Sequence, residues 1–150
     1  MKTVEFLALS LKLLRDERTP AGLRTAISRA YYAAFHRTSE FIQGMNVSVS
    51  DGPGAHGEVR NHLVHTGDDD IDQVGLDLAH LHSERIAADY RLKRVHVEKG
   101  LVADELVNLA SEVIATLNQC LSDSQRYATV VNGVGQRAKQ LKGGGGKSGS

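Results

Sequence analysis

Apolar residues recur along most of this chain at intervals of three and four, the spacing that places them on one face of an α-helix. The first run holds Val4, Leu7, Leu11 and Leu14. Runs with the same period predict five helices, over residues 3–16, 20–44, 56–65, 71–92 and 101–121. The 150 residues contain only two prolines, one at the start of a predicted helix and one between helices. The pattern therefore predicts an all-α fold.

Residues that start and stop helices mark several of these boundaries. Thr19 can cap the second helix through its hydroxyl, and Pro20 suits its first turn. Asp68 and the two aspartates after it precede the fourth helix, where negative charge matches the positive end of the helix dipole. Thr66-Gly67 ends the third helix, and residues 45–54, rich in Ser, Gly and Asp, are predicted to form a loop.

The periodic signal fades beyond Ser122. Residues 127–134 have the composition of a short additional element, whereas the glycine-rich residues 143–150 cannot pack and are expected to be disordered. The chain is therefore divided into one helical domain over residues 1–121 and a flexible, Gly-rich tail over residues 122–150.

Charge and cysteine content restrict the partners. The formal net charge is zero, so the chain has no overall positive field to hold long nucleic acid, and a local patch or a site shared between subunits must serve instead. The single cysteine, Cys120, excludes an internal disulfide and a cysteine-based zinc site. Without a signal peptide or a long apolar run, the chain is expected to be cytoplasmic, with no membrane contact.

Residues 60–65, Arg-Asn-His-Leu-Val-His, combine the groups that cleave RNA without a metal. Arg60 carries a permanent charge that fits phosphate, Asn61 can orient a hydroxyl, and His65 can transfer a proton near neutral pH. On an ideal helix Arg60 and His65 lie about 140° apart and converge only at a helix end. The alternative is structural: Arg60 covers the core with its aliphatic part, and His65 interacts with the helix dipole.

A second candidate site lies on the fourth helix. Arg85 occupies a position on the apolar stripe, and Asp89 follows four residues later. Arg85, Asp89 and Tyr90 could surround a phosphate, or Arg85 and Asp89 could simply form an ion pair. The basic residues that follow either are solvated or extend a phosphate track; they are Arg91, Lys93, Arg94 and Lys99.

Two further groups of polar residues have the spacing of possible sites. Arg29, Tyr32 and His36 share one edge of the second helix, which is either a solvated polar face or the lining of a shared cleft. His62 and His65 are three residues apart, as in some metal sites, but no carboxylate or cysteine completes a ligand set. No metal and no other cofactor are expected.

Three segments resemble the HEPN-domain proteins (higher eukaryotes and prokaryotes nucleotide-binding). Residues 26–36, Ala-Ile-Ser-Arg-Ala-Tyr-Tyr-Ala-Ala-Phe-His, resemble the second-helix signature of the family. Residues 85–90, Arg-Ile-Ala-Ala-Asp-Tyr, resemble a block of one small prokaryotic branch, and residues 56–59 with Thr66-Gly67 resemble its middle segment. The likeness covers residues 19–121.

The resemblance implies an up-and-down bundle of four to five helices that forms a homodimer. Many HEPN proteins are metal-independent endoribonucleases of toxin-antitoxin or phage-defence systems, often encoded beside a nucleotidyltransferase antitoxin. Their motif is an arginine followed a few residues later by a histidine, which residues 60–65 satisfy. This sequence departs from the family at Arg85, because Tyr90 stands where active members commonly have the histidine.

The sequence leads to two functional hypotheses, and a plain structural helical dimer is the third interpretation. In the first, the 2′-hydroxyl of RNA attacks the adjacent phosphate to give a 2′,3′-cyclic phosphate, with His65 as acid or base, Arg60 or Arg85 stabilising the phosphorane, and Asn61 orienting the nucleophile. In the second, Tyr90 marks a non-catalytic module that binds a nucleotide or a protein and regulates it. The candidate catalytic residues are Arg60, Asn61, His65, Arg85 and Tyr90, and the supporting residues are Arg29, Tyr32, His36 and Asp89.

Overall fold

The computed structural model describes residues 2–145. Over this range it contains six α-helices, one short 3₁₀-helix and no β-strand, which confirms the predicted all-α fold. The elements are α1 (Thr3–Asp16), α2 (Pro20–Gln43), α3 (Ala55–His62), α4 (Asp69–Tyr90), η1 (Val95–Glu98), α5 (Gly100–Ser122) and α6 (Ser124–Gly145).

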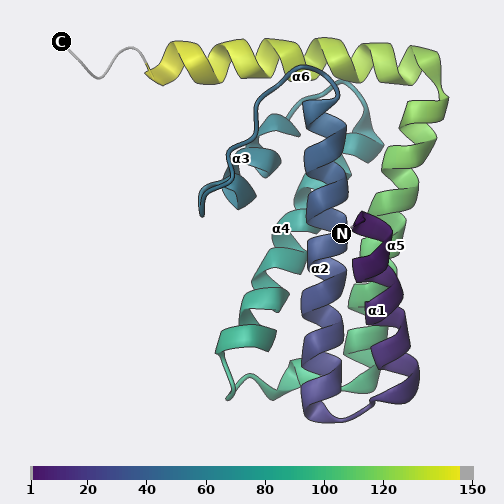
Figure 1. Ribbon diagram of the computed structural model, residues 1–150. Helices are drawn as coiled ribbons and strands as arrows, with labels where there is room; N and C mark the ends of the chain where they lie inside the picture. Colours follow the sequence, from purple (N-terminus) through teal and green to yellow (C-terminus); the bar gives the residue numbers. More distant parts are fainter. Residues whose placement is uncertain (1, 146–150) are drawn as a thin grey trace.

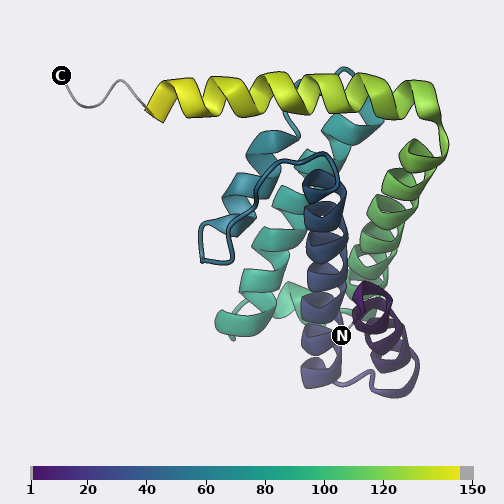
Figure 2. The same cartoon turned by 45° about the horizontal axis from the view of Figure 1, so that its top comes forward.

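Helix α2 is the centre of the bundle. It packs against α1, α4 and α5; α1 and α4 run in the direction opposite to α2, and α5 runs in the same direction (Figure 1). Short helix α3 lies beside the upper half of α4, and α6 lies across that end of the bundle in both views (Figures 1 and 2). Residues of α2, α3 and α4 therefore come together on one side of the molecule.

Small side chains allow the helices to approach α2 closely. Ala26, Ala30, Ala33 and Ala34 are fully buried along it, and the larger Ile27 and Ile42 fill the spaces between them. Fully or almost fully buried residues of the other helices complete this core; they are Val59, Ile71, Val74, Leu78, Leu81, Val107, Ala110, Val113 and Leu117. Burial of apolar side chains of this size is the main term that stabilises such a bundle.

The predicted caps are present. The Thr19 hydroxyl accepts from the backbone N–H of Gly22 at 3.1 Å, and Asp68 accepts from the N–H groups of Asp70 and Ile71. The third helix, however, ends at His62 rather than at residue 65. His65 lies beyond this end with φ of 57°, in the left-handed region that non-glycine residues seldom adopt.

The C-terminal segment differs most from the sequence prediction. Residues 124–145, predicted to be a flexible tail with at most a short element, form helix α6. Val130 and Val134 are fully buried, and Gly133 lies so close to the chain that a Cβ there would be 2.2 Å from the carbonyl oxygen of Thr66. Packing thus overrides the low helix propensity of glycine. The remaining residues of the expected disordered end, 146–150, lie outside the described range.

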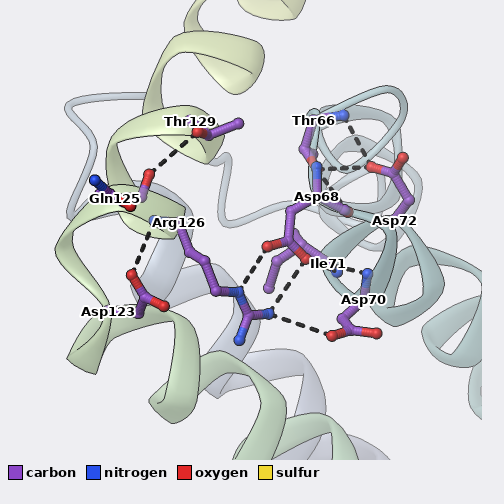
Figure 3. Close-up of polar contacts among 9 residues, drawn as sticks. All are labelled: Thr66, Asp68, Asp70, Ile71, Asp72, Asp123, Gln125, Arg126 and Thr129. Atoms are coloured by element: carbon purple, nitrogen blue, oxygen red, sulfur yellow. Dashed lines mark hydrogen bonds and ion pairs between the residues drawn. The ribbon is translucent and has the colours of Figure 1, made fainter.

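Arg126 links the start of α6 to the start of α4 through hydrogen bonds and ion pairs. The Arg126 guanidinium donates to both carboxylate oxygens of Asp68, at 2.8 and 3.2 Å, and lies 3.4 Å from Asp70 (Figure 3). The hydrogen bond from Arg126 lowers the pKa of Asp68 below its usual value, helped by the two backbone N–H groups that Asp68 caps. Asp68 therefore joins two helices as well as capping one.

Candidate active site

Two histidine rings stack on each other where α2, α3 and α4 meet. The imidazoles of His56 and His82 have centroids 4.9 Å apart and planes inclined by 24°. The ring of Tyr31 lies beside both, at 5.6 Å from His56 and 5.4 Å from His82. We call His56, His82, Tyr31 and the two arginines described next, Arg60 and Arg85, the imidazole cluster.

Tyr31 fixes the orientation of one imidazole. Its side chain is only 2% exposed, and its hydroxyl lies 2.5 Å from Nδ1 of His56. Burial raises the pKa of Tyr31 well above its usual value, so the hydroxyl stays protonated at neutral pH. Nδ1 of His56 is thereby engaged, and Nε2 is the nitrogen left for other partners.

Burial and two arginines favour the uncharged form of both imidazoles. Burial lowers the pKa of His56 and that of His82, and the positive charges of Arg60 and Arg85 lower both further. Arg60 reaches the cluster because its side chain runs toward the start of α3, where its Nε donates to the carbonyl oxygen of His56 at 3.3 Å. In the absence of a ligand the cluster therefore holds two imidazoles that favour the neutral form, near two permanent cations.

Arg85 is held between two tyrosines. Its guanidinium carbon is 5.0 Å from the centroid of Tyr32 and 5.4 Å from that of Tyr90, and one of its amino groups donates to the Tyr32 hydroxyl. Its Nε lies 2.9 Å from an oxygen of Asp89, so the ion pair considered from the sequence does form.

The pairing of Arg85 is nevertheless incomplete. Among the described residues its buried Nε–H has no acceptor in hydrogen-bond geometry, although the Asp89 oxygen is within reach. The distance shows a Coulombic contact, while the N–H direction shows that the bond is not properly made. That same Asp89 oxygen accepts from the Ser28 hydroxyl at 3.0 Å. Arg85 is therefore paired in charge but keeps one N–H without a well-directed acceptor.

Arg29, Tyr32 and His36 form an edge that is half covered. Phe6 of α1 lies over it, 5.4 Å from the ring of His36, and Tyr32 stacks on His36 at 5.9 Å. The Arg29 guanidinium lies 5.5 Å above Tyr32. Burial lowers the pKa of His36. Through Tyr32, this edge is continuous with the imidazole cluster, so it supports that site from the α1 side.

Of the six residues 60–65, here called the hexad, only Arg60 belongs to the imidazole cluster. Arg60, Asn61 and His65 line a shallow hollow of about 370 Å³ whose other walls are largely apolar. The Nε of Arg60, however, is turned back toward His56, and His65 lies past the opposite end of α3. Asn61 is exposed, and its carbonyl oxygen accepts from Arg137 of α6. The structure thus brings Arg60 and Arg85 to a common cluster but leaves Asn61 and His65 outside it.

Three members of the cluster, His56, His82 and Tyr31, are not among the site residues predicted from the sequence. His56 and Tyr31 lie within the segments that carry the family resemblance, and His82 lies outside them. One signal was available: His82, Arg85 and Asp89 are spaced by three and four residues and so share a helix face. The partners on α2 and α3 could not be found in this way.

Comparisons with known proteins identified no relative of this chain. A scan against protein-family models, a search of curated proteins and a search of solved structures each found no match. Among residues 2–145, no group of three or more His, Cys, Asp or Glu side chains is placed to hold a metal ion. Within the same range, none of the helices has the length and apolar character needed to span a membrane. The functional conclusion therefore rests on the chemistry of the cluster.

Proposed function

We propose that this protein is a metal-independent endoribonuclease and that the imidazole cluster is its active site. One observation carries the proposal: two stacked imidazoles with lowered pKa values lie beside two arginines. Cleavage of RNA through its own 2′-hydroxyl needs a base, an acid and positive charge near the phosphate. A stacked histidine pair flanked by arginines supplies all of these.

In the proposed reaction, His56 is the base. When Tyr31 accepts the Nδ1–H of His56, Nε2 carries the lone pair that takes the proton of the 2′-hydroxyl. The 2′-oxygen then bonds to phosphorus, and the bond from phosphorus to the 5′-oxygen breaks. His82, protonated in the presence of the phosphate charge, donates a proton to the leaving 5′-oxygen. The products are a 2′,3′-cyclic phosphate and a 5′-hydroxyl.

The arginines stabilise the charge that develops on the phosphorane. Arg85 has an N–H that the protein leaves without a well-directed acceptor, and Arg60 donates its Nε–H to the backbone carbonyl oxygen of His56. A phosphate oxygen would offer Arg85 better geometry than Asp89 does. Loss of one such preorganised donor typically lowers turnover by about 10²–10³-fold.

The family resemblance suggests the biological setting. We infer a homodimeric HEPN protein that acts as a toxin or phage-defence effector, with a nucleotidyltransferase antitoxin as partner. A subunit with zero net charge has no overall field for RNA, so two clusters side by side in a dimer would strengthen the local attraction.

The test is cleavage of RNA by purified protein in EDTA. Wild type is expected to leave a 2′,3′-cyclic phosphate, and His56→Gln to lose about 10²–10⁴-fold in rate. His80→Gln is the matched control, because His80 is exposed on α4 outside the cluster and the variant is expected to cleave like wild type. Wild type that cuts nothing, or His56→Gln that cuts like the control, would refute the proposal.

Tyr31→Phe provides a second readout. The substitution removes the hydroxyl that engages Nδ1 of His56 and keeps the ring that packs in the core. We expect a lower turnover and a shifted pH profile with little change in KM, because substrate binding does not involve this buried group. An unchanged pH profile would show that Tyr31 does not position the base.

A second function is favoured by the state of Arg85. Asp89 already occupies one side of this arginine, next to the exposed ring of Tyr90, as in a site that binds a nucleotide without cleaving RNA. Calorimetric titration with nucleotides distinguishes the two functions. Nucleotide binding that Arg85→Gln abolishes, in a protein that leaves RNA intact, would favour the regulatory module.

A further inference from the structure

The loop that follows α4 carries positive charge without matching negative charge. Arg91, Lys93 and Arg94 are all exposed, and none of them forms an ion pair with any residue in the described range. Together with Tyr90 they line an open hollow of about 590 Å³. In a chain whose net charge is zero, this is a local basic patch.

A buried arginine beneath the loop holds it in place. Arg24 of α2 is 7% exposed, and its guanidinium donates to five carbonyl oxygens at the end of α4 and in the loop; these belong to Ala87, Ala88, Arg91, Leu92 and Arg94. Its Nε donates to Glu98 at 2.8 Å. The loop carbonyls therefore face inward onto one cation, and the basic side chains are left on the outside.

An aromatic ring connects this patch to the imidazole cluster. Tyr90 is 70% exposed, and its ring lies 5.4 Å from the Arg85 guanidinium. His82 and Tyr90 are eight residues apart on α4, which corresponds to about 12 Å along the helix axis. If the phosphate at the cleaved bond of an RNA strand lies at the cluster, nucleotides close to that bond would therefore reach Tyr90.

We propose that Tyr90, Arg91, Lys93 and Arg94 form a subsite that holds RNA flanking the cleaved bond in single-stranded form. A base stacks on the free part of the Tyr90 ring, and the following phosphates bind the three cations. Double-stranded RNA would not fit, because its bases are already stacked and paired. This role rests on the proposed function, but binding at the subsite requires no cleavage.

The patch also contains exposed apolar side chains. Leu92 and Val95 are 75% and 60% exposed, and cations next to apolar residues can also bind an anionic membrane surface. Two features favour RNA: the basic loop is continuous with a cluster suited to phosphate chemistry, and Tyr90 packs against a cation as aromatic residues of strand-binding grooves do.

The experiment measures binding of a fluorescent twelve-nucleotide RNA in which every ribose is 2′-O-methylated, so that it cannot be cut. Its duplex form and anionic phospholipid vesicles are the competing probes. The variants are Tyr90→Leu, Tyr90→Phe and the triple variant Arg91→Gln/Lys93→Gln/Arg94→Gln. A triple variant of equal charge elsewhere, Lys12→Gln/Arg15→Gln/Lys139→Gln, is the control.

We expect wild type and the control to bind the single strand more tightly than the duplex. Tyr90→Leu should weaken binding roughly tenfold, whereas Tyr90→Phe should not. The loop triple variant should weaken it further and reduce the slope of log affinity against log salt by about 2, the value for three phosphate contacts on a single strand. Equal binding by the two triple variants, a preference for duplex, or binding to vesicles but not to RNA would overturn the subsite.

The outcome separates the subsite from the nuclease. If wild type cuts no RNA in EDTA but the loop variants still lose binding, the subsite stands and the proposed nuclease does not. If wild type cuts RNA and the loop variants bind and cut like the control, the subsite is wrong and the nuclease is unaffected.

Discussion

The two ends of α4 use positive charge in opposite ways. At its start, Arg126 meets the carboxylates of Asp68 and Asp70, and the charges are matched by direct hydrogen bonds (Figure 3). In its second half, Arg85 is only partly paired with Asp89, and the loop that follows carries cations with no partner in the described range. A charge whose partners are complete joins helices, whereas a charge left incomplete remains available for a ligand.

Arg24 shows that burial does not decide between these uses. It is about as buried as Arg85, yet it is bonded to five carbonyl oxygens and to Glu98, so no donor is left for a ligand. We therefore propose that Arg24 serves the fold and Arg85 serves the chemistry, two roles that substitutions can separate.

Replacing Arg24 should damage the fold most. Arg24→Met leaves Glu98 half-buried without its partner and several carbonyls without a donor, a change that typically costs about 3–5 kcal/mol of unfolding free energy. Urea unfolding followed by circular dichroism measures it. Arg18→Met is the control, because its ion pair with Asp104 is exposed and should contribute much less. Equal losses in the two variants would contradict the role given to Arg24.

Replacing Arg85 should affect activity more than stability. Arg85→Gln removes the hydrogen bond to Tyr32 and the contacts with two tyrosine rings, but Asp89 keeps its hydrogen bond from Ser28, so the thermal midpoint should fall by less than in Arg24→Met. RNA cleavage should fall by about 10²–10³-fold. Initial rates and a thermal melt on the same preparation test both halves of the prediction. A large drop in melting temperature with normal cleavage would place Arg85 with Arg24, as a structural residue.

The sequence predicted the bundle better than it predicted the site. Five helices could be located because long amphipathic periods and caps such as Thr19 and Asp68 are local signals. Helix α6 was not predicted, because the contacts that hold it, Gly133 on the Thr66 backbone and Arg126 on Asp68, join distant parts of the chain.

Only part of the candidate site could be predicted from the sequence, for the same reason. Arg85 was predicted as a site residue because a charge on an apolar stripe is unusual, and Arg60 because it lies in the Arg-Asn-His-Leu-Val-His segment. The stacking of His56 on His82 joins two helices, so no spacing within either helix reveals it. The turn that places His65 beyond the end of α3 was likewise not apparent, since residues 60–65 continue the helical pattern.

At the other end of α4, Arg126→Gln should lower stability by less than Arg24→Met and leave cleavage unchanged. The Arg126 side chain is partly exposed, so water replaces some of what the ion pair contributes. Its loss should also loosen the start of α6, which hydrogen exchange of the α6 amides would report. If Arg126→Gln lowered both the RNA cleavage rate and the hydrogen-exchange protection of the α6 amides, the start of α4 would not be independent of the active site.

The smallest effect is on the pH dependence of stability. The lowered pKa values of His36, His56, His62 and His82 mean that unfolded chains bind protons more readily, so stability should fall as pH drops below about 6.5. The lowered pKa of Asp68 stabilises the fold above about pH 3.9, and this contribution should disappear as pH falls through its folded value.

Unfolding free energies between pH 7 and pH 3 test these two ranges. The double variant His56→Gln/His82→Gln should lose part of the decline below pH 6.5, and Arg126→Gln should lose much of the decline below pH 4. Identical pH profiles for wild type and both variants would contradict the assignment of the two ranges.

The most direct test of the central claim compares two histidines. His82 belongs to the imidazole cluster, and His65 belongs to the hexad but lies outside the cluster. Initial rates of RNA cleavage in EDTA should fall by about 10²–10⁴-fold in His82→Gln and stay near those of wild type in His65→Gln. Full activity in His82→Gln together with loss of activity in His65→Gln would place the active site at the hexad and contradict this account.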